Sequence, residues 1–239
     1  MKSAIKQSGF SLTEVLMAVG ILSIGMMLVA TMFPVGIYLT SVASERTMAA
    51  IVADEAFAKI QLYHNYIVPY TNPANSYDYE SELGTNIDPN EFSYPSVDPH
   101  TVNPQYYWSA LYKFDPNSAG YLVTVFVARK TSPALTYPDP SGSSSDRPRV
   151  IDVNVQNVGK SDELNVLDGN EAYVNPPATI FDTKTSQLYS VVERIGNVVT
   201  LNRDWDANAP NPRPVWLVPP PETGGRNAGI EVYQRIIKF

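Results

Sequence analysis

The sequence contains no cysteine, and this absence removes several classes of protein at once. Without thiols there is no disulfide framework, no thiol nucleophile and no zinc–thiolate site. Histidine is almost as rare: only His64 and His100 occur, in different segments, and they lack the spacing of metal ligands. Nucleophile-elbow, P-loop and dinucleotide-binding motifs are also missing from the sequence. We therefore expect a protein that is not an enzyme.

Positive charge is scarce as well. Lysine and arginine total 17 against 24 aspartates and glutamates, which gives a net charge of −7 and a pI near 4.8. Binding to nucleic acid needs clustered lysine and arginine, so this balance predicts no nucleic-acid partner. Apolar residues make up 44% of the chain, which is enough for a hydrophobic core of ordinary size.

One long stretch lacks charge altogether: Val15–Leu39 holds 25 residues without Asp, Glu, Lys or Arg. As a helix it extends about 37 Å and spans a hydrocarbon layer of about 30 Å. Because Lys2 and Lys6 precede it, the positive-inside rule places the amino terminus in the cytoplasm and the acidic remainder across the inner membrane. Pro34 lacks a backbone donor and is expected to kink or loosen this helix.

The residues just before the apolar run have an unusual order. Residues 9–17 read Gly-Phe-Ser-Leu-Thr-Glu-Val-Leu-Met, and a short basic leader precedes them. A secretory signal peptide has its apolar run before the cleavage site and loses that run on cleavage. Here the one processing point that the sequence suggests lies before the run. Cleavage would therefore leave the run on the mature protein.

This arrangement resembles the class III signal of type IV pilins and type II secretion pseudopilins, over about the first thirty residues. The resemblance implies that a prepilin peptidase cuts between Gly9 and Phe10 and methylates the new amino terminus at Phe10. Glu14 then becomes the fifth residue of the mature chain, where family members carry a glutamate that guides assembly. The alternative is an uncleaved signal anchor, with Glu14 at the headgroup interface.

Helical periodicity continues beyond the apolar run. Apolar residues recur at three- and four-residue steps and form one stripe: Ala49, Val52, Ala53, Ala56, Ile60 and Tyr63. Glu55 and Lys59 lie outside this stripe as a favourable i,i+4 pair. The chain therefore divides into a leader at 1–9, a long helix at 10–66 with its transmembrane segment at about 15–39, and a β-rich head at 67–239.

The head has the period of β-strands. Tyr106–Phe114 and Tyr121–Lys130 alternate and flank a turn-rich connection, which predicts a hairpin. Further strands are expected at Val150–Val155, Leu188–Ile195, Val198–Arg203, Val215–Val218 and Ile230–Phe239, the last with Ile230 and Val232 on one face. Thr71–Pro104 and Thr131–Pro148 are interpreted as loops. The fold class is α+β, a long helix with a mostly antiparallel sheet. Whether the strands after Val150 form a second small barrel stays open.

The head offers two further candidates for chemistry. One is an acidic cluster whose hard oxygen ligands suit calcium: Asp162, Glu163, Asp168, Asn170 and Glu171. Some pseudopilins bind calcium in a head loop, but the spacing here matches no calcium-loop motif, and a solvated loop is the simpler interpretation. The other is His64, which we interpret as a solvated or capping group at the helix end. No other cofactor is expected.

Together these patterns favour a structural subunit, processed at Gly9 and packed by its helix into a type IV pilus or a type II secretion pseudopilus. A Glu14 carboxylate is costly in lipid and seeks a cation. In the family that cation is the amino terminus of an adjacent subunit, here Phe10. Expected partners are other pilins, the prepilin peptidase and the inner-membrane assembly platform. The large head favours a minor pilin or pseudopilin. The alternative is a single-pass anchored binding or surface module that does not polymerise.

Overall fold

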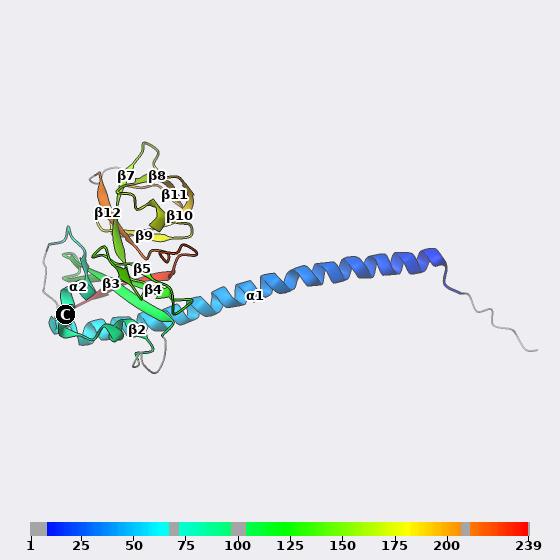
Figure 1. The fold of residues 1–239 in the computed structure, drawn as a ribbon, viewed down its shortest axis with the longest axis horizontal. Helices are drawn as coiled ribbons and strands as arrows, with labels where there is room; N and C mark the ends of the chain where they lie inside the picture. The colour runs from blue at the N-terminus through cyan, green and yellow to red at the C-terminus, as the bar shows by residue number, and fades with distance from the viewer. Residues whose placement is uncertain (1–8, 67–71, 97–103, 207–210, 239) are drawn as a thin grey trace, which may run out of the picture. The chain divides into compact units, whose positions relative to one another are not determined.

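The computed structural model describes residues 9–66, 72–96, 104–206 and 211–238 (Figure 1). The chain divides into two compact units, one ending at Glu45 and one beginning at Arg46. The first unit holds the amino-terminal part of one long helix, and the second holds the rest of that helix together with the described strands. The predicted α+β class is confirmed. The predicted leader, residues 1–9, lies outside the described residues except for Gly9.

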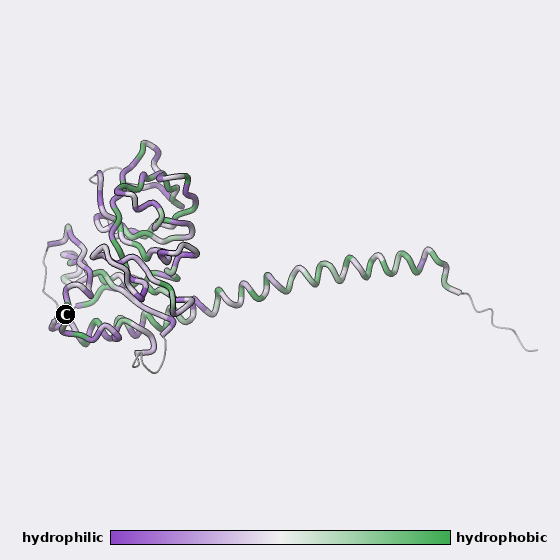
Figure 2. Tube along the Cα trace, viewed as in Figure 1, coloured by the Kyte–Doolittle hydropathy of each residue, from purple (hydrophilic) through white to green (hydrophobic). Residues whose placement is uncertain are grey.

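Helix α1 spans Leu12–Leu62 and begins where the side chain of Ser11 caps its first turn. Figure 2 shows its amino-terminal part as predominantly hydrophobic, and the apolar side chains there are exposed. In the described part of the chain, α1 is the one helix long and apolar enough to cross a membrane. The helix continues through Pro34 without interruption, so the expected kink stays a prediction.

The part of α1 after Arg46 packs its apolar stripe against the sheet. The predicted stripe is confirmed: Ala49, Val52, Ala53, Ala56 and Ile60 are buried, and Tyr63 packs partly buried at the edge of the same cluster. Phe57 is also buried there and was missed in the periodic pattern. The stripe therefore serves as the spine on which the sheet rests.

The carboxyl end of α1 is close to the predicted one. After Leu62 the chain continues as a single 3-10 turn, η1 (His64–Tyr66), instead of a further α-helical turn. The Nδ1–H of His64 donates to the carbonyl of Gln61 at 2.7 Å. This bond satisfies one of the carbonyls that a helix end leaves without a partner. His64 is thus a capping group.

The sheet beside the helix is antiparallel and has five strands. These are β1 (Tyr77–Asp78), β2 (Ser93–Tyr94), β3 (Tyr106–Asp115), β4 (Gly120–Arg129) and β13 (Gly229–Ile237). Their order is β1-β3-β4-β13, with β2 also paired to β3. The predicted β3–β4 hairpin is confirmed, and so is the return of the carboxyl-terminal strand to this sheet. Trp108 and Tyr112 of β3 pack towards the helix, whereas Leu111 packs on the opposite face.

Strand β13 corrects one expectation about faces. The alternating pattern puts Ile230 and Val232 on one face, but Ile230 and Tyr233 pack against the helix-side core and Val232 packs on the other side. The pairing of β13 with β4 is irregular between Gly229 and Glu231. An extra residue at such a bulge changes which side chains share a face, which a strict two-residue period does not anticipate.

Six strands close into a barrel, which settles the question that the sequence left open. They are β7 (Ile151–Asn157), β8 (Glu163–Val166), β9 (Thr179–Asp182), β10 (Gln187–Ile195), β11 (Val198–Leu201) and β12 (Arg213–Leu217). The closed order is β10-β11-β8-β7-β12-β9. Four of these strands match predicted segments, whereas β8 and β9 were not predicted. A separate hydrophobic core, which includes Leu164, Ile180 and Val199, fills the barrel.

The two segments interpreted as loops contain short ordered elements, so that interpretation was wrong in part. Residues 71–104 include β1, β2, α2 (Tyr79–Leu83), η2 (Gly84–Asn86) and η3 (Pro89–Phe92). Residues 131–148 include a small hairpin of β5 (Tyr137–Pro138) and β6 (Ser144–Ser145). Tyr79, Leu83 and Phe92 enter the helix-side core. Their burial against distant residues, rather than a local period, orders these segments.

The barrel covers the face of the sheet opposite α1 (Figure 1). A third apolar cluster joins the two, with Leu111 and Phe126 from the sheet and Phe181 from the barrel. The Nζ of Lys113 on β3 donates to the carbonyl of Thr183 at 2.7 Å, in the turn between β9 and β10. The sheet is therefore a layer between the second part of the helix and the barrel.

A short helix η4 (Glu171–Tyr173) follows β8.

Candidate functional site

Ser11 and Glu14 define the first turn of α1. The N–H of Glu14 lies 3.0 Å from the carbonyl oxygen and 3.2 Å from the hydroxyl oxygen of Ser11. The hydroxyls of Ser11 and Thr13 lie 2.8 Å apart. Ser-x-x-Glu is the pattern of a capping box, in which the N-cap hydroxyl meets the N–H of the third helical residue. The positive end of the helix dipole also favours a carboxylate here. Local geometry therefore fixes where the Glu14 carboxylate leaves the helix.

The predicted processing point lies just before this turn and is open. Gly9 and Phe10 are non-helical and exposed, with 83% of Phe10 accessible. No atom lies within 4 Å of the place where a Cβ on Gly9 would stand. In the described part of the chain, nothing blocks a protease from the peptide bond between these two residues.

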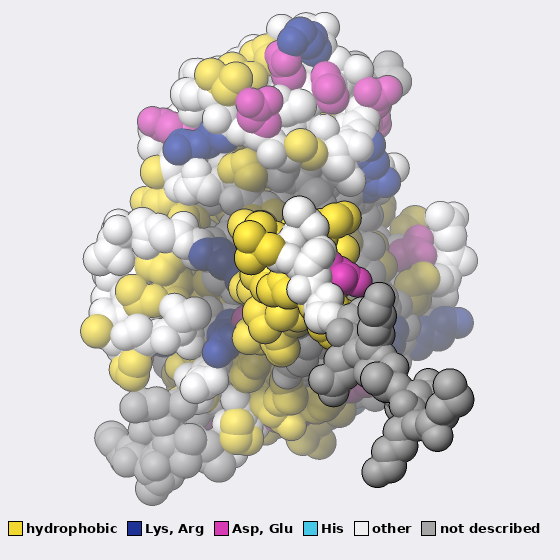
Figure 3. Space-filling model, turned by 90° about the vertical axis from the view of Figure 1, so that its right-hand side faces the viewer, with side chains coloured by type: hydrophobic (Ala, Val, Ile, Leu, Met, Phe, Trp, Pro, Cys, Tyr) yellow, Lys and Arg dark blue, Asp and Glu magenta, His cyan; other side chains and the backbone are white. Residues whose placement is uncertain are grey.

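The helix surface after Glu14 is apolar on all sides. Between Gly9 and Ser44, Glu14 is the one charged residue. The side chains from Val15 to Leu39 are exposed in the structure, and the space-filling view shows hydrophobic side chains gathered on the helix (Figure 3). A helix that is hydrophobic all round belongs in lipid or among other helices. The apolar run therefore has the surface of a membrane span.

Hydroxyl groups within the run are satisfied by the helix itself. Ser23 donates to the carbonyl of Val19, and Thr31 donates to the carbonyl of Leu28, each at 2.8 Å. Such bonds remove the cost of a polar side chain in lipid. Pro34 instead leaves a backbone group of the helix unsatisfied. Because proline has no N–H, the carbonyl of Ala30 lacks its usual helical donor. This is the physical basis for expecting a weak point there.

Ion pairs join the second part of α1 to the head. Arg235 on β13 lies 3.0 Å from Asp54, and Lys59 lies 2.9 Å from Glu55, as the i,i+4 spacing predicted. Lys59 also lies 3.0 Å from the Glu91 carboxylate, and its side chain is only 12% exposed. The sequence analysis predicted only the ion pair between Glu55 and Lys59 within the helix. The structure adds that Lys59 holds the η3 segment against the helix.

The acidic cluster does not come together. Asp162 and Glu163 lie at the start of β8, whereas Asp168, Asn170 and Glu171 follow its end. Glu163 pairs with Lys160, and Asp168 accepts from the Nδ2 of Asn154 at 3.0 Å. Among the described residues, no group of three or more His, Asp or Glu is placed to hold a metal ion. The residues of this cluster therefore share no metal site in the described part of the chain, and calcium binding by them stays a hypothesis. His100 lies outside the described residues.

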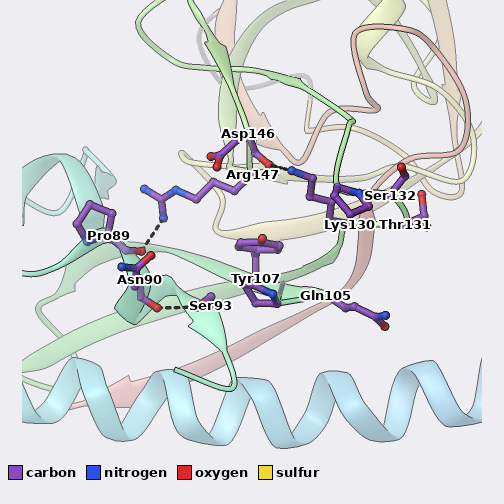
Figure 4. A pocket seen from close by; sticks show the side chains of 12 residues that line it. Pro89, Asn90, Ser93, Gln105, Tyr107, Lys130, Thr131, Ser132, Asp146 and Arg147 are labelled. Atoms are coloured by element: carbon purple, nitrogen blue, oxygen red, sulfur yellow. Dashed lines mark hydrogen bonds between the residues drawn. The ribbon is translucent and has the colours of Figure 1, made fainter. Parts of the chain in front are cut away.

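The head also contains a cavity that the sequence analysis did not anticipate. It has a volume of about 350 Å³ and lies between the start of β3 and the segments that lead towards the barrel (Figure 4). Its lining includes Asn90, Gln105, Tyr107, Lys130, Ser132 and Arg147. These residues are scattered in sequence and form no motif, so no sequence signal pointed to them.

Comparison with known protein families finds one match. Residues 5–30 match the prokaryotic N-terminal methylation motif. The search of the curated proteins and the search of the solved structures found no match. The matched residues include Gly9, Phe10 and Glu14 with the first part of α1. The chain thus carries the class III prepilin leader of type IV pilin-like precursors, as the resemblance indicated.

Proposed function

We propose that this chain is a structural, non-enzymatic subunit of a type IV pilus or a type II secretion pseudopilus. The observation that carries the proposal is the continuity of α1. One helix begins at a methylation motif, is apolar on every side through the run, and then becomes the spine of an α+β head. A simple anchor does not need its helix to continue into the core of the head.

Maturation on this proposal is cleavage between Gly9 and Phe10 by a prepilin peptidase, followed by methylation of the Phe10 amine. The exposed glycine gives the enzyme access to the backbone. The apolar run stays on the mature chain and holds it in the inner membrane, with the amino terminus on the cytoplasmic side and the head across the membrane.

Assembly depends on pairing of Glu14 with the amino terminus of a neighbouring subunit. An ionised carboxylate is costly in lipid, and the cost falls when a cation lies beside it. The capped first turn fixes the backbone position from which the Glu14 side chain leaves the helix. A neighbour shifted along the filament axis leaves both the carboxylate and the Phe10 amine without a partner. Electrostatics therefore selects one axial register.

Processing is tested by mass spectrometry of the amino-terminal peptide from cells that contain a prepilin peptidase. The expected mature chain has 239 − 9 = 230 residues and begins with methylated Phe10. Gly9→Val should leave the full-length precursor in the membrane. Gly20→Val is the matched control, because that glycine lies in the helix after the cut and has no atom near its Cβ position. Normal maturation of Gly9→Val would show that the cut lies elsewhere.

The competing proposal is a membrane-anchored module that does not polymerise. It uses the signal only for insertion into the membrane and does not assemble into a filament. The two proposals therefore separate at Glu14, since an anchor gains nothing from a charge in its membrane segment.

A further inference from the structure

The cavity in the head has the features of a ligand site. It lies where the sheet meets the segments that lead into the barrel, and junctions between structural modules are common places for small-molecule sites. Its volume of about 350 Å³ falls at the lower end of the range for such sites. A single inorganic ion would leave most of that space empty. The lining mixes one aromatic ring with charged, amide and hydroxyl groups.

Lys130 supplies the positive charge of the cavity. Its Nζ donates to the backbone carbonyl of Asp146, which is a neutral partner (Figure 4). Among the described residues, this carbonyl is the hydrogen-bond partner of the Lys130 ammonium group. The side chain of Asp146 also lines the cavity, so Lys130 offers a partner for a single carboxylate group, not a positive field that would hold a polyanion.

Arg147 has a different role, because its guanidinium is already engaged. It forms an ion pair with Glu80, donates to the carbonyl of Pro89 at 3.3 Å and lies over the Phe92 ring at 5.4 Å. These contacts fix the wall of the cavity. They leave Lys130 as the cation that an incoming anion would meet.

Tyr107 forms the apolar part of the site. Its ring stands between Arg147 and Lys130 in the close view (Figure 4). Burial, together with the nearby Asp146, raises the pKa of Tyr107 to about 12, so its hydroxyl remains a hydrogen-bond donor at neutral pH. Asn90 and Ser132 add an amide and a hydroxyl to the lining. Aromatic and amide groups side by side suit a ring-shaped molecule that carries hydroxyls.

We propose that this cavity binds an acidic sugar, a hydroxyl-bearing ring with one carboxylate. The carboxylate pairs with Lys130, the ring packs on Tyr107, and hydroxyls bond to Asn90 and Ser132. A lipid chain does not fit a lining with so many polar groups, and a polyanion such as nucleic acid is repelled by the acidic protein. The inference is independent of filament assembly, since it concerns the head of a single subunit.

The test uses the full chain in a polyoxyethylene detergent, which contains neither sugar nor phosphate. Sodium glucuronate, glucose and inorganic phosphate are titrated separately in a calorimeter. We expect glucuronate to bind with a dissociation constant in the millimolar range or lower. Glucose lacks the carboxylate and phosphate lacks the hydroxyl-bearing ring, so each should bind at least tenfold more weakly. An oligosaccharide that ends in glucuronate shows whether the site takes a glycan end or only the free sugar.

Substitutions at two lysines test whether glucuronate binds in this cavity. Lys130→Gln should weaken glucuronate binding by about tenfold or more, and Lys130→Arg should retain it, because the charge is kept. Lys160→Gln, the same change at an exposed lysine beside β8, should leave binding unaltered. Three results would overturn the proposal: no glucuronate binding at millimolar concentration, equal binding of glucose or phosphate, or unchanged binding by Lys130→Gln.

Discussion

The N–H of Arg129 donates to the carbonyl of Ala228 at 2.9 Å, although 228 − 129 = 99 positions separate the two residues. Strand β4 ends at Arg129, and β13 begins directly after Ala228. The chain therefore leaves the sheet and returns to it at one point. The barrel is an insert in what would otherwise be a plain hairpin of β4 and β13.

The insert should be removable. Replacing residues 130–227 with Asn-Gly joins Arg129 to Ala228 through a two-residue turn that suits an antiparallel hairpin. Removal uncovers the apolar face that the barrel covers, so Leu111→Thr and Phe126→Thr are added. Removal also takes away Arg147 and Arg149, which pair with Glu80, so every excised chain carries Glu80→Gln. We expect this short chain to keep cooperative thermal unfolding. The same excision without the two polar substitutions should aggregate. A non-cooperative transition in the substituted chain would show that the helix and sheet need the barrel to fold.

The buried stripe of α1 gives a second prediction. Ala53→Asp or Ala56→Asp places a carboxylate in the core, where the alanines are 2% and 0% exposed. An unpaired buried charge costs several kcal/mol, on the order of 3 or more, so the melting temperature should fall steeply. Ala50→Asp is the matched control, because Ala50 is exposed on the same helix. Equal melting curves for Ala50→Asp and Ala53→Asp would mean that the buried face is assigned wrongly.

A buried ion pair inside the barrel gives a third prediction. Arg213 lies 2.7 Å from Asp182, with side chains 2% and 0% exposed. Removing one partner leaves the other charge buried, so Arg213→Met should cost about 3–5 kcal/mol and lower the melting temperature on the order of 10 °C. The double variant Asp182→Leu/Arg213→Met should recover part of the loss.

The matched control for this pair is Arg235→Met. Arg235 pairs with Asp54 in an exposed setting, where a pair contributes about 1 kcal/mol or less. If Arg213→Met destabilised the protein no more than Arg235→Met, the barrel pair would not be the buried contact that the structure shows.

The pH dependence of stability provides a fourth prediction. Burial raises the pKa of Glu80 above its ordinary value of 4.5, although Arg147 and Arg149 act in the opposite direction. The folded protein then holds this proton more tightly than the unfolded chain does. Stability from Glu80 is therefore present below pH 4.5 and is lost as the pH rises through the pKa of the folded state.

Thermal unfolding measured from about pH 4 to pH 8 tests whether the contribution of Glu80 to stability falls as the pH rises. The difference in melting temperature between wild type and Glu80→Gln should change across the window, because the variant cannot titrate there. Parallel curves for Glu80→Gln and wild type would contradict the raised pKa.

Local patterns predicted much of this fold. The apolar run and the stripe from Ala49 to Ile60 follow a helical period, which a sequence shows directly. Strands β3 and β4 have a clear alternation and a short connection. The motif at Gly9, Phe10 and Glu14 was found for the same reason, since its residues are neighbours in sequence and share one turn of helix.

The parts that sequence analysis missed depend on distant partners. Strand β9 has only four residues, and it becomes a strand through its pairing with β10 and β12. Tyr79 lies in a segment of turn-forming residues and is ordered by the helix-side core. The lining of the cavity comes from separate segments, so Tyr107 and Lys130 have no spacing that would mark them.

The central claim is that Glu14 directs assembly, and incorporation of a Glu14→Leu chain tests it most directly. The amount of the variant in sheared filaments or with partner pilins is measured beside its level in the membrane, with Glu45→Leu on the same helix as control. We expect normal membrane levels and cleavage, and incorporation reduced about tenfold or more, since about 1.4 kcal/mol of register preference per subunit corresponds to tenfold. Incorporation of Glu14→Leu equal to that of wild type and of Glu45→Leu would contradict the account and favour a simple membrane anchor.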